Sequence, residues 1–316
     1  MNSSIGWKIS SPLVVGQISK PGRGQRVNQD VVAQYIPRDA VLLARKGALF
    51  IVADGMRGCP AGEVASHLAA QTVLSAYYAS SLPDPVQSLR AAVMMADGWI
   101  RYWAAARPDL RGMGTTLTAV VVRGGELIIA HVGDSRAYLV RGGHAWPLTR
   151  DHTWVADALA RGLLTPPEAA NHPWRHVLTR SLGSRSAVAV DVRRVVYAPG
   201  DRLVLCSDGV SNLVVPQEIG WLAGRSPRQA AQALVGMARR RGGQDDVSTV
   251  VVSLGRPAWR PRPVITASRR APQQRYGVLA GATTLHAPAL QVFLLALSLG
   301  AAGLVVLLGM ILAAGG

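Results

Sequence analysis

The chain has 316 residues, 49% of them hydrophobic, which is enough for one large domain or two small ones with a substantial core. Its 34 Lys and Arg residues against 18 Asp and Glu give a net charge of +16. That balance is typical of proteins that meet nucleic acid or an anionic membrane surface. Because only two Phe occur and no basic stretch is interleaved with aromatic residues, we predict no nucleic-acid partner. We interpret the charge as facing phosphate groups and a membrane.

Two features of the sequence bear on the compartment. The two cysteines, Cys59 and Cys206, are too few for a disulfide framework and fit a reducing environment. Residues 1–20 lack a basic start followed by an apolar run, so no secretory signal is expected there. Both features suit a domain that folds in the cytoplasm.

Residues 1–255 carry alternating strand-like and helix-like patterns, which predict one domain. In chain order the predicted elements are a strand at Ala48–Ala53, helices at Glu63–Ala79 and Val86–Ala106, a strand at Leu127–Val132, two short helices within Asp151–Asn171, a strand at Leu203–Cys206, a helix at Pro227–Arg241 and a strand at Val247–Leu254. Because strands and helices come in groups rather than in strict alternation, the pattern favours antiparallel sheets covered by helices.

The remainder of the chain has a different composition. Residues 256–287 are rich in Pro and Arg and read as a juxtamembrane linker. Residues 288–314 carry no charge, and Val292–Leu312 is almost wholly apolar, which predicts one transmembrane helix, with a buried core helix or hairpin as the alternative. Six Arg precede this segment and no basic residue follows it, so the positive-inside rule predicts a single-pass membrane protein whose residues 1–255 are cytoplasmic.

Aspartates recur at the ends of the predicted strands. Asp54, Asp134 and Asp208 follow apolar strands, and Asp245 precedes one. Each Asp-Gly or Gly-Asp pair alone is an ordinary turn. Four of them, together with Asn28-Gln29-Asp30, favour convergence on a cation site, and carboxylates without His or Cys suit Mg²⁺ or Mn²⁺. Two such ions sharing a carboxylate can activate a water for in-line attack on phosphorus.

These residues resemble a known family, the metal-dependent serine/threonine protein phosphatases (type 2C protein phosphatases) in their bacterial form. The matching segments occur in the family's order and span nearly all of residues 10–255. They are Gly22–Asp30, Val52–Met56, Ala61–Ser66, Met113–Leu117, His131–Tyr138, Leu148–Val155, Asn171–Gly183, Cys206–Gly209 and Gln244–Val252. One Asp-Gly pair has no weight as evidence, whereas this ordered set is specific.

The resemblance implies an α+β fold, a four-layer α-β-β-α antiparallel β-sandwich with metals in a cleft at one edge. It implies hydrolysis of phosphoserine and phosphothreonine in proteins by a water that two Mn²⁺ or Mg²⁺ ions activate, opposing a eukaryotic-type serine/threonine kinase. The residues carried over are the core metal ligands Asp54, Gly55 (through its carbonyl), Asp208 and Asp245, Asp134 for a third and weaker metal, and Asp30 orienting a water. Asp54, Asp208, Asp245 and Asp30 are the predicted catalytic residues.

Two glutamines depart from the family's pattern. Gln29 stands where the family usually has Glu, and Gln25 holds the position of its phosphate-binding Arg. Arg26, Arg23 and Arg57 are therefore the candidates for binding substrate phosphate, because a guanidinium fork suits phosphate oxygens. The alternative function is a catalytically weak, membrane-tethered module that binds phosphoproteins.

Four further residues have predicted roles that are not catalytic. Thr115 and Thr116 are expected to pack beneath the site. The segment Thr153–Pro173 resembles the family's mobile flap, and its two conspicuous histidines, His152 and His172, are interpreted as solvated or capping residues rather than metal ligands.

Overall fold

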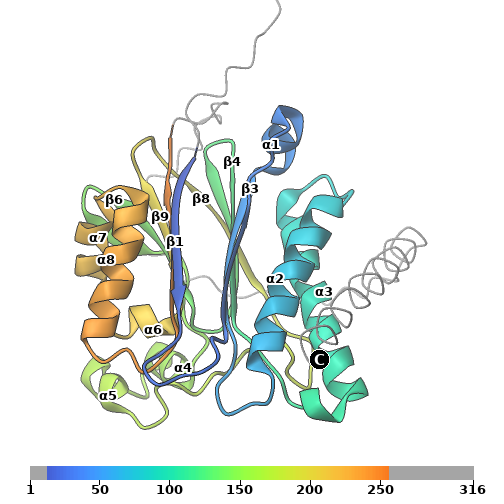
Figure 1. The fold of residues 1–316 in the computed structure, drawn as a ribbon, viewed down its shortest axis with the longest axis vertical. Helices are drawn as coiled ribbons and strands as arrows, with labels where there is room; N and C mark the ends of the chain where they lie inside the picture. Colours follow the sequence, from blue (N-terminus) through green and yellow to red (C-terminus); the bar gives the residue numbers. More distant parts are fainter. Residues whose placement is uncertain (1–12, 256–316) are drawn as a thin grey trace, which may run out of the picture. The chain divides into compact units, whose positions relative to one another are not determined.

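Two five-stranded antiparallel sheets form the centre of the computed structural model, which describes residues 13–255 (Figure 1). The first sheet has the order β1 (Val14–Lys20), β10 (Val247–Ser253), β9 (Arg202–Cys206), β6 (Arg136–Arg141) and β7 (His144–Pro147). The second has the order β2 (Asp30–Tyr35), β3 (Ala48–Asp54), β4 (Leu117–Arg123), β5 (Glu126–Val132) and β8 (Asp191–Val196).

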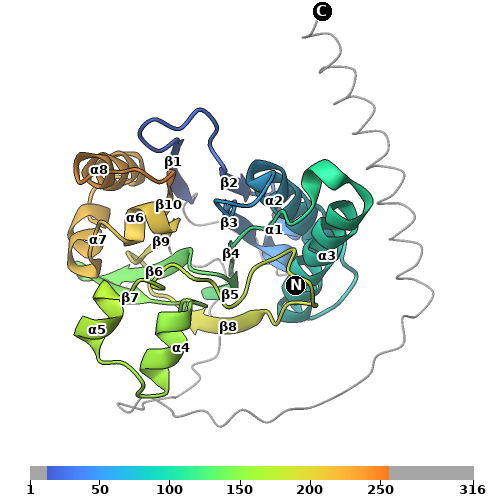
Figure 2. The ribbon, with the colours of Figure 1, turned by 90° about the horizontal axis from the view of Figure 1, so that it is seen from below.

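Helices cover the outer face of each sheet. The helices are α1 (Ala40–Lys46), α2 (Gly62–Ala79), α3 (Pro85–Ala106), the 3₁₀ helix η1 (Pro108–Leu110), α4 (Trp154–Ala160), α5 (Pro166–Asn171), α6 (Asp208–Ser211), α7 (Pro216–Ala223) and α8 (Pro227–Arg240). Figure 2 shows α7 and α8 on one side of the paired sheets and α2 and α3 on the other. The described residues thus form the predicted four layers.

Three hydrophobic cores separate these layers. One lies between α2, α3 and the second sheet, one between the two sheets, and one between the first sheet and the helices α6 to α8. Strand β3 contributes to two of them, since Leu49 and Ile51 face the helices while Phe50 and Val52 face the other sheet. A strand buried on both faces has no polar alternation, which is why β3 reads as an unbroken apolar run in the sequence.

The predicted elements are confirmed, with ends shifted by one to three residues. The sequence patterns missed the strands β1, β2, β4, β6, β7 and β8 and the helices α1, α6 and α7. Strand β8 shows the reason: its sequence, DVRRVV, carries two arginines, and the strand is mostly exposed at a sheet edge. Helix α1 is only seven residues long and begins at a cap where Asp39 accepts a hydrogen bond from the Leu42 amide.

The predicted linker and transmembrane segment lie outside the described residues. Within residues 13–255, no helix is both long enough and apolar enough to cross a bilayer.

The core between the sheets gives a stability prediction. Phe50 is fully buried there, so Phe50→Ala should lower the free energy of unfolding by about 3–5 kcal/mol through lost transfer energy and a residual cavity. Denaturant unfolding followed by circular dichroism measures the change. The control is Val41→Ala on α1, where the side chain is 73% exposed and the change should stay within about 0.5 kcal/mol. Equal effects of the two substitutions would contradict this core assignment.

Candidate functional site

Strand register brings Asp30 and Asp54 together. Asp30 begins β2 and Asp54 ends β3, and the two are direct partners across the antiparallel pair. The next strand, β4, places Thr116 beside them, and the Thr116 hydroxyl accepts a hydrogen bond from the Asp54 amide at 3.1 Å. The second sheet therefore presents two carboxylates at one of its ends.

The first sheet brings its own aspartates to the matching end. Cys206 of β9 pairs with Arg136 of β6 and with Thr249 of β10. Asp208 lies two residues after Cys206, while Asp134 and Asp245 lie just before β6 and β10. Because the strands are antiparallel, a residue after β9 and residues before its two neighbours meet at the same end of the sheet.

Electrostatic coupling shows that the two sheets bring their aspartates together. The pKa of Asp54 lies well above its usual range, first because of burial and then because of the negative charges of Asp30, Asp208, Asp134 and Asp245. The pKa of Asp134 is also raised well above its usual range, by burial and then by Asp208. The sandwich thus gathers five predicted site aspartates at one place.

Asp30 and Asp245 show how the local surroundings modify this effect. Burial raises the pKa of Asp30 to about 7, against the opposing hydrogen bonds from Ser248 and Ser207. The Ser207 hydroxyl donates to Asp30 Oδ2 at 2.8 Å. The pKa of Asp245 is raised to about 6 by burial and the charge of Asp208, and the Arg57 guanidinium partly offsets that rise.

The donor chemistry of the cluster fits a hard divalent cation. Two buried carboxylate oxygens, Asp30 Oδ1 and Asp208 Oδ1, have no hydrogen-bond partner among the described residues. A buried carboxylate without a partner is costly, and a cation offsets that cost. Within residues 13–255, no three His, Cys, Asp or Glu side chains stand at chelating distance around one point, so an ion held by Asp54, Asp208 and Asp245 together requires these side chains to turn toward it. Carboxylate oxygens without His or Cys suit Mg²⁺ or Mn²⁺, and Mg²⁺ keeps several waters as further ligands.

Thr115 and Thr116 lie beneath the cluster, as predicted. Both are buried, and the Thr115 hydroxyl donates to the Asp54 carbonyl at 2.8 Å. The Thr116 hydroxyl lies 2.7 Å from the Ser135 hydroxyl, next to Asp134. The two threonines therefore fix the backbone on both sides of the Asp54 side chain.

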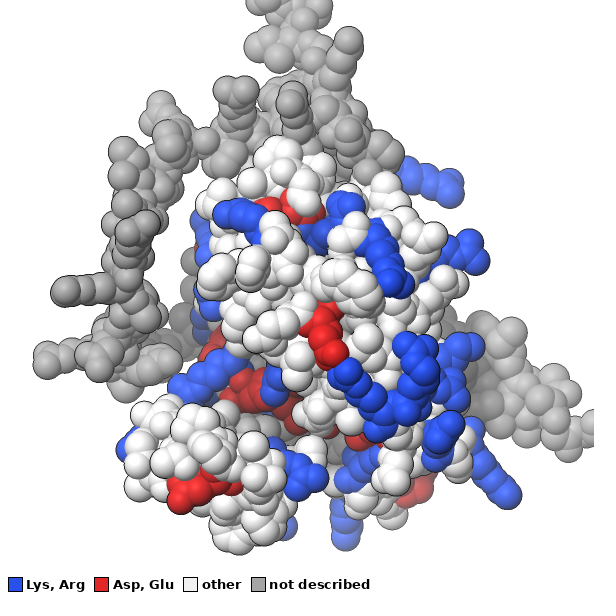
Figure 3. Space-filling view, turned by 90° about the vertical axis from the view of Figure 1, so that its left-hand side faces the viewer, with Lys and Arg blue, Asp and Glu red and all other residues white. Residues whose placement is uncertain are grey.

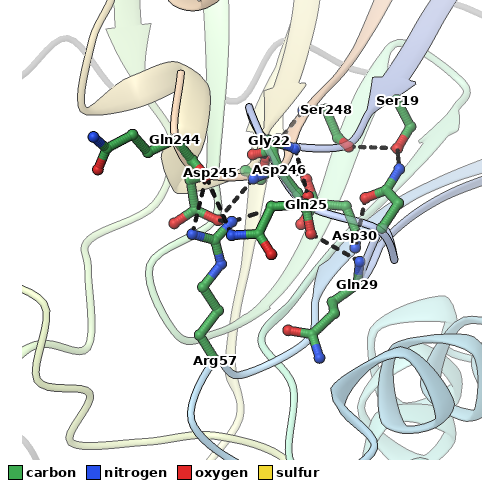
Figure 4. Close-up of polar contacts among 12 residues, drawn as sticks. Ser19, Gly22, Gln25, Gln29, Asp30, Arg57, Gln244, Asp245, Asp246 and Ser248 are labelled. Atoms are coloured by element: carbon green, nitrogen blue, oxygen red, sulfur yellow. Dashed lines mark hydrogen bonds and ion pairs between the residues drawn. The ribbon is translucent and has the colours of Figure 1, made fainter. Parts of the chain in front are cut away.

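Sequence reasoning missed the role of Asp246. Its Oδ1 accepts from the Gly22 amide and its Oδ2 from the Gln29 amide, each at 2.8 Å, so one buried carboxylate holds both ends of the loop between β1 and β2 (Figure 4). The Asp245-Asp246 doublet is the signal that could have found it, since two adjacent carboxylates before a buried strand need two different partners.

The Gln29 side chain turns toward a glutamate. Gln29 Nε2 donates to Glu63 Oε2 at 3.3 Å, while the Gln29 carbonyl accepts from the Ser66 hydroxyl at 2.7 Å. An ionised glutamate at position 29 in this orientation would repel Glu63. The uncharged Gln29 side chain avoids this repulsion and donates a hydrogen bond to Glu63 instead.

The three candidate arginines differ in their surroundings. Arg57 Nη2 forms a close ion pair with Asp245 Oδ1, and Nη1 donates to the Gln244 carbonyl at 3.2 Å (Figure 4). Arg23 and Arg26 are exposed, and their side chains make no hydrogen bond or ion pair with any residue in the described part of the chain. The structure therefore brings only Arg57 into contact with the aspartate cluster.

The interpretation of His152 as solvated or capping is wrong, whereas His172 does cap a helix. His172 ends α5, and its Nδ1 accepts from the Trp174 amide at 3.1 Å. His152 is only 5% exposed, and both of its ring nitrogens have partners inside the protein. Its Nδ1 accepts from the Gly133 amide at 3.1 Å, so Nε2 carries the proton and lies 3.2 Å from Asp191 Oδ2. His152 thereby supports the backbone beside Asp134.

Comparison with known proteins identifies what the fold and site resemble. Residues 23–239 match the family model described as Protein phosphatase 2C. Serine/threonine phosphatase stp of Listeria welshimeri is 35% identical over 210 residues, which cover 65% of this chain and 83% of that protein. The crystal structure of the Mycobacterium tuberculosis serine/threonine phosphatase PstP has a TM-score of 0.68 and 35% identity, covering 77% of this chain and 99% of that one. A structure of the PstP catalytic domain in complex with two manganese ions has a TM-score of 0.64 and 34% identity, covering 78% of this chain and all of that one.

The raised pKa of Asp30 predicts a pH-dependent stability in the chelated protein. The folded state binds the Asp30 proton more tightly than the unfolded state, so this group's contribution to stability falls as pH rises from 3.8 to about 7. Asp30→Asn should abolish that contribution. The variant should therefore gain stability relative to the wild type across the window, as measured by urea unfolding in EDTA. Asp109→Asn, at a carboxylate that is 59% exposed, should show no such gain with rising pH. A difference in unfolding free energy between Asp30→Asn and the wild type that stays the same at every pH would contradict the raised pKa of Asp30.

Proposed function

The chain belongs to the protein phosphatase 2C family, and we propose that its aspartate cluster hydrolyses phosphoserine and phosphothreonine in proteins with two Mn²⁺ or Mg²⁺ ions. Membership of the family makes the chain a metal-dependent serine/threonine protein phosphatase of the bacterial type. The observation that supports placing the chemistry here is the gathering of five aspartates, four of which raise the pKa of buried Asp54 and two of which have an unpartnered buried oxygen. The PstP structure with two manganese ions supports the number and kind of ions proposed.

Each aspartate has a proposed role. Asp54 would be a ligand to both core ions, and the Gly55 carbonyl would help to hold one of them. Asp208 and Asp245 would help to hold the other, and Asp134 would hold a third ion. Bound ions supply positive charge that lowers the pKa of water and neutralises phosphoryl oxygens.

Asp30 has a separate role through its free oxygen. Ser207 holds Oδ2, which leaves Oδ1 without a partner and able to accept a hydrogen bond from the attacking water. A water oriented in this way loses little entropy on reaching the attacking position. The Thr115 and Thr116 hydroxyls hold the Asp54 backbone rigid beside it.

Metal removal and aspartate substitutions test this function with p-nitrophenyl phosphate as substrate. Activity of the full chain should vanish in EDTA and return with Mn²⁺. Asp54→Ala and Asp208→Ala should each lower kcat by about a thousandfold or more, because each removes a proposed ligand of the ions that activate water. Asp134→Ala should be milder at saturating Mn²⁺.

The matched control is Asp109→Asn, an exposed carboxylate paired only with Arg107, which should keep full activity. Turnover that survives chelation would contradict the metal-dependent site. Tight binding of phosphopeptides without any turnover in Mn²⁺ would favour the alternative, a phosphoprotein-binding module.

A serine/threonine kinase and a membrane are proposed as partners. A phosphatase for protein substrates needs a kinase that supplies them, so we place this enzyme opposite a eukaryotic-type serine/threonine kinase. The membrane proposal rests on the apolar run Val292–Leu312 and the six Arg before it. Lys and Arg are also plentiful on the face shown in Figure 3, which carries α7 and α8, with exposed Arg225, Arg228 and Arg240. Each basic residue near an anionic leaflet adds roughly 1 kcal/mol of attraction.

Removal of residues 256–316 tests the proposed anchor. The full chain should fractionate with membranes, whereas the truncated chain should be soluble and keep its activity on p-nitrophenyl phosphate. Dephosphorylation of a membrane-embedded phosphoprotein should slow on truncation, because tethering raises the effective concentration. Protease outside intact cells should leave residues 1–255 uncut. Full-length protein in the soluble fraction, or cleavage of that domain from outside, would overturn the topology.

A further inference from the structure

Arg57 occupies a cation position within the aspartate cluster. It follows the Asp54-Gly55-Met56 turn, and its Nη2 pairs with Asp245 Oδ1 and lies 3.9 Å from Asp246 Oδ1. Asp246 already accepts two backbone hydrogen bonds, so Asp245 is the carboxylate that depends on Arg57 for its positive partner. Asp245 is also one of the proposed metal ligands. Its Oδ1 cannot keep the close ion pair with Arg57 while it coordinates a metal ion, so the two cations compete for this oxygen.

The pair lies where it can open. The Arg57 and Asp245 side chains are 36% and 35% exposed, so water can replace either partner. Ion pairs with this degree of exposure contribute little to stability, because water screens the two charges. A divalent ion that several oxygens share binds a carboxylate more strongly than one guanidinium does, because it carries twice the charge in a smaller volume.

Gln25 shows where a released guanidinium would go. Gln25 Nε2 donates to the Gln244 carbonyl at 3.5 Å, the same oxygen that accepts from Arg57 Nη1 (Figure 4). The Arg57 guanidinium therefore stands beside the side chain at position 25, where the sequence places an uncharged residue. Of the three candidate arginines, Arg57 is the one whose side chain shares a hydrogen-bond acceptor with Gln25, since the Arg23 and Arg26 side chains make no hydrogen bond or ion pair with the described residues.

We propose that Arg57 is an exchangeable cation, which neutralises Asp245 until a divalent ion binds that carboxylate and then, released beside Gln25, binds the substrate phosphate. This inference rests on the proposed function, because it needs Asp245 to be a metal ligand. In this exchange Arg57 pairs with Asp245 only while no metal ion is bound there, so the ion pair does not prevent metal binding. It also makes metal loading a condition for binding phosphate, since the two events share one side chain. Such sharing is a positive coupling between two ligands, and each must raise the affinity of the other by the same factor.

Manganese binding to the full chain tests the exchange without using activity. Arg57→Gln removes the competing charge, so calorimetric titration with Mn²⁺ should show the affinity of one site rise about tenfold. Arg38→Gln is the matched control, because it removes the same charge from an exposed side chain that lies beyond the opposite end of β2 from Asp30. It should change the Mn²⁺ affinity by less than about twofold.

Inorganic phosphate provides the second readout. In the wild type, saturating phosphate should tighten Mn²⁺ binding, and Arg57→Gln should lose that coupling while Arg38→Gln keeps it. Equal Mn²⁺ affinity in the wild type and Arg57→Gln, or undiminished coupling in Arg57→Gln, would overturn the exchange while leaving the metal site intact. A wild-type chain that binds no Mn²⁺ would overturn the proposed function together with the exchange.

Discussion

Mutual repulsion among buried carboxylates is the constraint that shapes one end of this sandwich. The pKa of Asp54 is raised first by burial and then by the negative charges of Asp30 and Asp208, and the pKa of Asp30 is raised by burial with a smaller contribution from Asp208. The surrounding structure offsets part of this repulsion with the Ser207 hydroxyl and the Arg57 guanidinium. The rest is left uncompensated in two unpartnered oxygens, which makes the end of the sandwich a site for cations.

The two-sheet architecture creates this concentration of charge. Each sheet alone carries two or three aspartates at its end, and stacking the sheets brings both sets together. The turns must also be very tight: a Cβ at Gly55 would lie 2.4 Å from the Gly62 carbonyl oxygen, and one at Gly209 would lie 2.0 Å from that of Asp246. The glycines next to Asp54 and Asp208 are thus required by the close approach of neighbouring backbone.

Fold and site differ in how far the sequence predicts them. Strand β3 was predictable because both of its faces are buried, so its residues are apolar up to Asp54. Strand β10 was predictable because five of its seven residues, four Val and one Thr, are β-branched. Strand β8 was not, because an exposed edge strand can carry arginines at little cost. The aspartates stood out because a carboxylate at the end of an apolar run is unusual.

Their partners did not stand out. Ser207 and Asp246 act on segments about 180 and 220 residues away along the chain, and a hydroxyl or a second carboxylate looks the same in a turn as in a network. The same distance hid the pairing of Arg57 with Asp245, so sequence reasoning left three arginines open. His152 was misjudged because one of its partners, Asp191, lies 39 residues away on an edge strand that the sequence pattern missed.

The central proposal is that this carboxylate cluster binds two divalent ions that both contact Asp54. Anomalous diffraction at the manganese edge, from crystals grown with Mn²⁺, tests that claim most directly because it locates each ion independently of activity. We expect two strong peaks at the end of the sandwich, both within coordination distance of Asp54. One of the two peaks should also lie within coordination distance of Asp208 and Asp245. Peaks elsewhere on the protein, or none at the cluster in crystals of the active enzyme, would contradict it.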